Sequence, residues 1–239
     1  MEVPTTEEYA DRESRMAQLA AEQFRERTEN PTIPKKPLSY RFVKRLIDIV
    51  LSLIVIVVFF IPGAILCVAI ARDTGGSPFY LQTRVGRGGR PFQIIKFRTM
   101  VADSDNLEHY FDEEQMDEWI YEHKVTNDPR ITKLGSFLRR TSIDEFPNFI
   151  NSLLGQMSIV GPRAVTPEEL VWYNGDVDLL LSVPAGITGY WQVKSRNNAQ
   201  YETGERQAME LYYVRNASLG LDAKIFFGTF AAVFGKTGA

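Results

Sequence analysis

The hydrophobic positions of the chain concentrate in one stretch, IVLSLIVIVVFFIPGAILCVAIA, which fills residues 49–71 without a single charge. At about 1.5 Å per residue, a helix of this length covers the roughly 30 Å core of a bilayer. The stretch lies too far from the N-terminus, and is too long, for a cleavable signal sequence. It predicts a membrane helix, and a fully buried helix of a soluble protein is the alternative.

Pro62 and the flanking charges indicate how this helix meets the membrane. A proline inside a helix removes a backbone hydrogen bond and clashes with the preceding turn, which costs about 3 kcal/mol or more. Basic residues, which favour the cytoplasmic side of a membrane, flank the stretch at both ends. They are Lys35, Lys36, Arg41, Lys44 and Arg45 before it, and Arg72, Arg84, Arg87, Arg90, Lys96 and Arg98 after it. The pattern predicts a reentrant helix over residues 40–72 that breaks near Pro62 and returns to the same face, with Asp48 paired to Lys44 one turn back. A kinked spanning helix is the alternative.

Outside the apolar stretch, the pattern predicts a polar extension, a hairpin and several helices. Residues 1–39 form a polar extension that ends in a proline-rich linker. Alternating β-formers around a glycine-rich turn predict a hairpin over about residues 78–84 and 92–97. Helices are expected over residues 103–122, 131–140, 145–154, 166–174 and 203–214, and a strand over the end of PAGITGYWQV. The apolar-rich helix at the C-terminus is expected to lie at the membrane surface or to pack on the core.

Composition excludes several classes of site. The net charge of −3 over 239 residues gives no basic excess, so nucleic acid is not an expected partner. A single cysteine, Cys67, makes an internal disulfide impossible. With only His109 and His123 beside it, a zinc site of the usual kind is not expected. A metal here would be held by oxygen, which points to magnesium or manganese.

The segment TSIDEFPNFI places two carboxylates, Asp144 and Glu145, side by side. Ser142 and Glu145 match a capping box, whereas Pro147 fits the first helical turn better if Asp144 is the N-cap. Either choice puts both carboxylates at a helix N-terminus, where the dipole favours an ionised group. That suits a nucleophile or a magnesium ligand. A capped structural helix is the simpler interpretation, and both stay open.

Two arginines, Arg139 and Arg140, precede this pair and could supply phosphate-binding forks. One of them could equally only cap a helix or bind lipid headgroups. Lys96 and Arg98 alternate with Phe97 on the predicted hairpin, where a solvated face is the simpler interpretation.

The run DPRITKLGSFLRRTSIDEFPNFINSLLGQMSIVGPR, residues 128–163, resembles the bacterial sugar transferases that are monotopic phosphoglycosyl transferases. Upstream, KRLIDIVLS and FYLQTRVGRGGRPFQIIKFRTM are similar to the family's membrane helix and hairpin. Downstream, GITGYWQV, the SRN that follows it and LYYVRNASLGLDAKI are similar to later family segments. The resemblance covers about residues 40–235 in the expected order. Ala164 departs from it, because the family usually has proline there.

The resemblance implies transfer of a sugar 1-phosphate from a UDP-sugar to a polyprenol phosphate, with release of UMP. It implies that Asp144 is the nucleophile and that Glu145 acts as magnesium ligand or acid/base partner, so that both carboxylates are candidate ligands of Mg²⁺. Arg139, and with it Lys96, Arg98 and Arg163, are candidate phosphate-binding residues, although Arg163 could instead pin a loop. A non-catalytic scaffold and a glycosyltransferase that releases UDP are the alternatives.

The fold class expected is α/β: a membrane-associated monotopic domain with a Pro-broken reentrant helix, amphipathic surface helices and a small sheet. Residues 73–239 would form the cytosolic catalytic domain, on the cytoplasmic face of the cell inner membrane. The expected partners are a UDP-sugar, a polyprenol phosphate and membrane lipids. The sugar, the pathway and the oligomeric state are left open, with a homodimer as one option.

Overall fold

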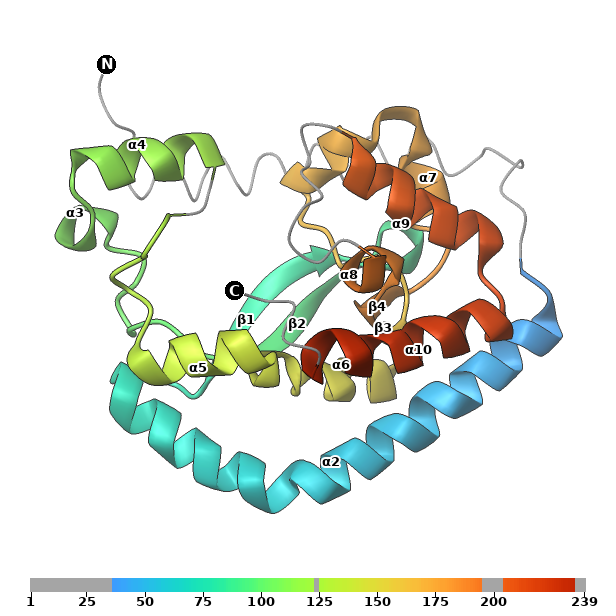
Figure 1. The fold of residues 1–239 in the computed structure, drawn as a ribbon, viewed down its shortest axis with the longest axis horizontal. Coiled ribbons are helices and arrows are strands. Elements are labelled where there is room, and N and C mark those ends of the chain that lie inside the picture. The colour runs from blue at the N-terminus through green and yellow to red at the C-terminus, as the bar shows by residue number, and fades with distance from the viewer. Residues whose placement is uncertain (1–35, 123–124, 195–203, 235–239) are drawn as a thin grey trace.

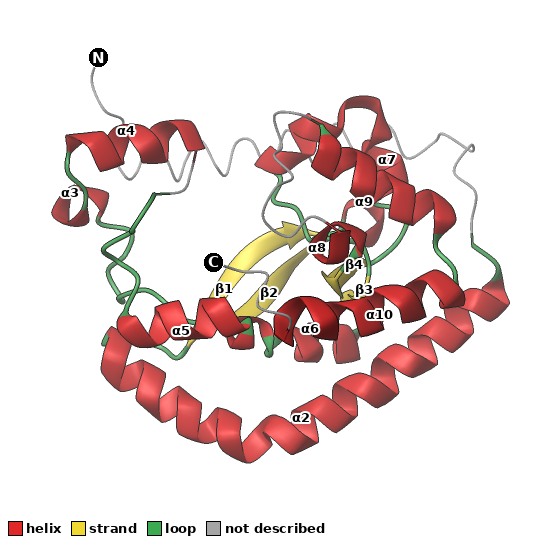
Figure 2. Cartoon of the chain, in the orientation of Figure 1, coloured by secondary structure: helices red, strands yellow, loops and turns green. Residues whose placement is uncertain are grey.

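A computed structural model describes residues 36–122, 125–194 and 204–234. Two small sheets lie at the centre, with helices around them (Figures 1 and 2). Most of the polar extension expected over residues 1–39, and the SRN segment at 195–197, lie outside the described residues. The elements therefore begin with the long helix α2.

Helix α2 (Leu38–Thr74) is one uninterrupted helix of 37 residues with Pro62 inside it. It runs along the lower edge of the molecule and bends near its middle, so that both ends turn toward the same body (Figure 1). Among the described residues, α2 is long and apolar enough to cross a membrane, and only 11% of its apolar window is buried. That exposure contradicts the buried soluble helix. The proline is accommodated within the helix and does not divide it into two elements.

The predicted hairpin is confirmed as β1 (Phe79–Val85) and β2 (Pro91–Phe97), which pair antiparallel with Phe79 opposite Phe97. A second, parallel pair joins β3 (Met157–Val160) to β4 (Ala185–Thr188). The pattern missed β3, because all four of its residues are buried and no alternation marks it. The strand expected toward the end of PAGITGYWQV was misplaced: β4 ends at Thr188, and the next residues form α8 (Tyr190–Lys194).

The remaining helices agree with the expected ranges in part. Helix α5 (Lys133–Thr141), α9 (Glu205–Asn216) and the C-terminal α10 (Leu219–Phe234) are confirmed. The helix expected over 103–122 is two, α3 (Leu107–Tyr110) and α4 (Glu113–Glu122). The helix expected over 145–154 begins only at Asn148, as α6 (Asn148–Leu154). The helix expected over 166–174 is a 3₁₀ helix (Glu168–Asp176), and α7 (Val177–Leu180) follows it.

The first half of α2 is fastened to the globular body by buried carboxylates. Asp222 of α10 accepts hydrogen bonds from the Tyr40 hydroxyl (2.9 Å), the Lys44 ammonium (3.0 Å) and the Tyr213 hydroxyl (2.7 Å). Asp48 accepts from the Ser158 hydroxyl and from the backbone N–H that follows it, both at 3.0 Å. The expected Asp48–Lys44 pair is therefore wrong: Lys44 reaches α10, and Asp48 holds the beginning of β3.

The second half of α2 is fastened to the same body by apolar contacts. Ile70 packs with Phe97 of β2 and Leu138 of α5 in one cluster, to which Phe59 and Leu66 also belong. Helices α5 and α6 lie along the concave side of α2 (Figure 1). Both halves of the apolar helix thus contact one face of one body.

Candidate active site

The Asp144–Glu145 pair lies on a short 3₁₀ turn (Ile143–Glu145) between α5 and α6. In a 3₁₀ helix, residues i and i+3 lie on the same face. Ile143 and Phe146 accordingly both pack into the cluster formed with α2, where the Phe146 ring lies 4.5 Å from the ring of Phe59, centroid to centroid. The sequence Ile-Asp-Glu-Phe thereby turns its apolar ends onto α2 and its two carboxylates away from it.

The capping box expected from the sequence does not form. Ser142 adopts a left-handed conformation, with φ of 58°, and its backbone N–H closes the end of α5. Its side chain makes no capping hydrogen bond to the turn that follows. The Glu145 carboxylate binds Lys96 instead. The two carboxylates therefore occupy a junction between helices, and not the N-terminus of a long one.

Lys96 reaches the pair from β2. Its Nζ lies 2.9 Å from Oε1 of Glu145, and their side chains are 25% and 37% exposed. A pair this open adds little to stability, since exposed ion pairs contribute about 0–1 kcal/mol. Its consequence is electrostatic: it fixes a positive charge beside Glu145 and near Asp144.

Burial raises the pKa of Asp144 to about 6, and the negative charge of Glu145 adds to the rise. The positive charges of Lys96 and Arg139 act in the opposite direction. The sequence led us to expect an ordinary ionised carboxylate at a helix end; the group is instead half-buried and less acidic. At pH 7 about a tenth of it is protonated, so the ionised, nucleophilic form still predominates.

Arg139 stands in the last turn of α5, where its Nε donates to the Thr99 hydroxyl at 2.8 Å. Of the four predicted phosphate-binding residues, Arg139 and Lys96 thus act on Asp144. Thr99 lies two residues after the end of β2, and the sequence alone assigned it no role. The available signal was its place three residues after Lys96, in the segment KFRTM.

The structure does not bring Arg98 and Arg163 into contact with the carboxylate pair. The Arg98 Nε donates to the carbonyl of Ser77 at 2.8 Å. Arg163 pairs with Glu169 at 2.6 Å, and its backbone N–H donates to Glu210 at 2.8 Å. These contacts support the alternative that Arg163 pins a loop.

Asp144 and Glu145 could hold a magnesium ion only if phosphate oxygens and water completed its coordination shell. No cluster of three or more metal-ligating His, Cys, Asp or Glu side chains occurs in the part of the chain that the structure describes. Mg²⁺ is commonly bound by one or two carboxylates, with phosphate oxygens and water completing its shell. Asp144 and Glu145 supply such a pair, and the repulsion between them, which helps to raise the pKa of Asp144, is what a cation would relieve.

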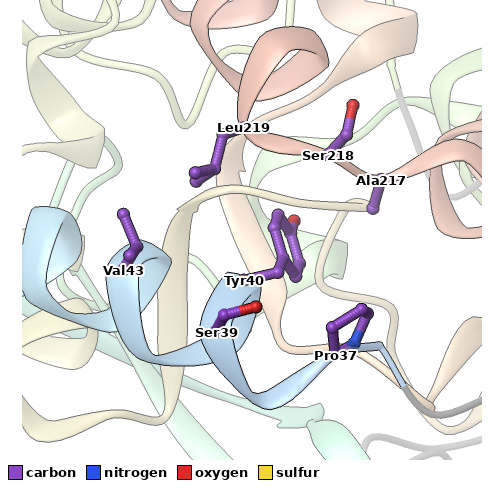
Figure 3. A pocket seen from close by; sticks show the side chains of 7 residues that line it. All are labelled: Pro37, Ser39, Tyr40, Val43, Ala217, Ser218 and Leu219. Atoms are coloured by element: carbon purple, nitrogen blue, oxygen red, sulfur yellow. The ribbon is translucent and has the colours of Figure 1, made fainter.

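A separate groove of about 360 Å³ opens at the other end of the molecule, where α2 begins (Figure 3). It lies between the first turns of α2 and the segment that joins α9 to α10. Its lining comprises Pro37, Ser39, Tyr40, Val43, Ala217, Ser218 and Leu219. None of these side chains is charged, so the groove does not resemble a phosphate site.

Fold and site together define a domain of helices and small sheets with one helix long and apolar enough to cross a membrane. An Asp–Glu pair lies in it, and two cations act on that pair. The sequence profile of the bacterial sugar transferase family matches residues 39–236, and the chain belongs to this family. Its membership confirms the resemblance drawn from the sequence.

Three relatives illustrate the similarity. The chain is 44% identical over 204 residues to the UDP-galactose-lipid carrier transferase of Erwinia amylovora, an alignment that covers 84% of this chain and 42% of that one. It is 41% identical over 204 residues to the undecaprenyl-phosphate galactose phosphotransferase of Salmonella typhimurium, with the same coverage of 84% and 42%. With the exopolysaccharide production protein ExoY of Rhizobium meliloti it shares 40% identity over 194 residues, 80% of this chain and 84% of that one. The chain thus spans less than half the length of the first two.

The electrostatic balance at Asp144 gives a prediction. Replacing Lys96 with Met removes a positive charge that favours the carboxylate, so the pKa of Asp144 is expected to rise further above about 6. NMR of isotope-labelled aspartate carboxyl groups, followed through a pH titration, measures it. Lys133→Met, at the exposed first position of α5, is the control and should leave the titration unchanged. An unchanged or lowered pKa in Lys96→Met would contradict the electrostatic account.

Proposed function

We propose that the chain transfers a sugar 1-phosphate from a UDP-sugar to a polyprenol phosphate such as undecaprenyl phosphate, and releases UMP. The observation that carries the proposal is the Asp144–Glu145 pair, with Lys96 bound to Glu145, the charges of Lys96 and Arg139 acting on Asp144, and the turn packed on α2. The names of two relatives describe transfer of galactose to a lipid carrier and to undecaprenyl phosphate. We extend that chemistry to this chain.

In the proposed reaction, a carboxylate oxygen of Asp144 attacks the phosphorus that bears the sugar. The bond from this phosphorus to the bridging oxygen breaks, and UMP leaves with that oxygen. The phosphosugar is then an acyl phosphate on Asp144. A phosphate oxygen of the polyprenol phosphate attacks the same phosphorus, and the Asp144 carboxylate leaves. No net proton or electron is required, which suits a site made of charges and not of proton relays.

The surrounding residues of the chain neutralise and orient charge. Arg139 offers a planar fork to a phosphate, and Lys96 offers a point charge while it also holds Glu145. Glu145 and Asp144 would hold Mg²⁺ together with the phosphates of the substrate. The ion would supply the charge neutralisation that phosphoryl transfer needs.

We further propose that α2 is reentrant, which places the site at the cytoplasmic surface of the cell membrane. Support comes from the contacts of both halves of α2 with one body, and from the basic residues on both sides of its apolar stretch. Helix α10 adds Phe227 and Phe230, which are 70% and 50% exposed and suit an interfacial position. There a lipid-borne phosphate and a water-soluble UDP-sugar can both reach Asp144.

Reentrance predicts that the two ends of α2 lie on the same side of the bilayer. Single cysteines at Ser39 and Asp73, introduced after replacement of Cys67 by Ala, should both react with an impermeant thiol reagent added to inside-out vesicles. Both should be protected in right-side-out vesicles. Labelling of the two positions from opposite sides would mean a spanning helix.

The transfer itself is tested by nucleotide release. Purified protein with Mg²⁺, undecaprenyl phosphate and a panel of UDP-sugars, beginning with UDP-galactose, should release UMP with one donor. Asp144→Asn should abolish release, because the amide is not a nucleophile, and Asp105→Asn, at an exposed aspartate outside the site, should not affect it. Release of UDP would identify an ordinary glycosyltransferase. No release with any donor would favour a scaffold.

A further inference from the structure

Thr99 connects the hairpin to α5 through two different groups. Its hydroxyl accepts from Nε of Arg139 at 2.8 Å, and its carbonyl accepts from the backbone N–H of Thr132 at 3.1 Å. Thr132 is the N-cap of α5, and its hydroxyl accepts from the backbone N–H of Gly135 at 2.9 Å. One buried residue, 7% exposed, thus meets both the first and the last turn of the helix.

The approach of α5 to Thr99 is close enough to require a glycine. A Cβ added at Gly135 would overlap the Thr99 carbonyl oxygen, since the two would lie far inside contact distance. The helix is therefore seated directly against the Thr99 backbone. Because helical side chains lean toward the N-terminus, Arg139 in the last turn can fold back along α5 and reach the same residue.

The hydrogen bond to Thr99 uses only the Nε–H of the Arg139 guanidinium. A guanidinium carries five N–H donors, and the Nε–H is the one used here. Within the described part of the chain, Nη1 and Nη2 have no hydrogen-bond partner, and the residue is exposed. Among the charges that act on Arg139, that of Asp144 is the strongest. The outer edge of the anchored guanidinium therefore has no hydrogen-bond partner among the described residues, and the charge of Asp144 acts on the same guanidinium.

We propose that Thr99 is the positioning residue for Arg139: by accepting from Nε, its hydroxyl aims the outer edge of the guanidinium at the phosphate that reacts with Asp144. This role deepens the proposed transfer and rests on it. Arg140 offers the contrast, because it is exposed and its side chain makes no hydrogen bond with the described residues. Of two adjacent arginines, only Arg139 is held in one orientation by Thr99.

The positioning role is tested by a variant that removes the Thr99 hydroxyl and keeps the shape of the side chain. Thr99→Val is nearly isosteric, and we expect it to lower kcat/KM for the UDP-sugar about ten- to a hundredfold, since a small misplacement of a positioning group costs that much. Thr99→Ser, which retains the hydroxyl, should restore most of the activity. In an Arg139→Ala background, Thr99→Val should cause no further loss, because the group that it positions is gone.

A second readout does not depend on catalysis. NMR of isotope-labelled arginine should show the Arg139 Nε–H protected from exchange in the wild type and in Thr99→Ser, and unprotected in Thr99→Val. Thr99→Ala serves as the hydroxyl-free variant if valine disturbs folding. Wild-type kcat/KM in the hydroxyl-free variants, or an equal loss with and without Arg139, would overturn the positioning role.

The two proposals fail in different ways. If the wild type releases no UMP with any donor, the proposed function fails, and the exchange measurement still decides whether Thr99 anchors Arg139. If the wild type is active and Thr99→Val is equally active, the function stands and the positioning role is wrong.

Discussion

The contact between the turn Ile143–Glu145 and helix α2 is the constraint on which the site depends. The Phe146 ring packs at a tilt against that of Phe59, and Ile143 joins the same cluster as Ile70. Because residues three apart share a face in a 3₁₀ turn, seating these two apolar side chains forces the intervening carboxylates to the other side. Helix α2 therefore orients Asp144 and Glu145, and a change in the course of α2 would move the site.

The position of the turn determines which charges act on Asp144 and Glu145. Asp144 is half-buried, which raises its pKa, and its neighbour Glu145 raises the pKa further. Two cations from separate elements, Lys96 on β2 and Arg139 on α5, limit the rise. The hairpin and α5 are held to each other through Thr99. The result is a carboxylate with a raised pKa and two positive charges that act on it.

The sequence predicted the elements whose pattern is long or regular. The uncharged stretch within α2, the alternation of β1 and β2 and the amphipathic α5 could all be read from it. Strand β3 could not, since four fully buried residues show no period. The sequence left Ser142 and Asp144 open as N-caps and placed both carboxylates at a helix N-terminus. They lie instead in a 3₁₀ turn that contacts Lys96 and α2.

The site was predictable as a list of residues and not as an arrangement. Lys96 and Arg139 act on Asp144, but Arg98 and Arg163 find partners elsewhere, which only the folded chain reveals. If Asp144 takes the phosphosugar, intact-protein mass spectrometry should detect it after incubation with Mg²⁺ and the donor UDP-sugar, without polyprenol phosphate. We expect a gain of one sugar phosphate that maps to the peptide containing Asp144 and disappears on addition of polyprenol phosphate. Release of UMP on addition of the lipid, with no adduct at any time, would contradict it.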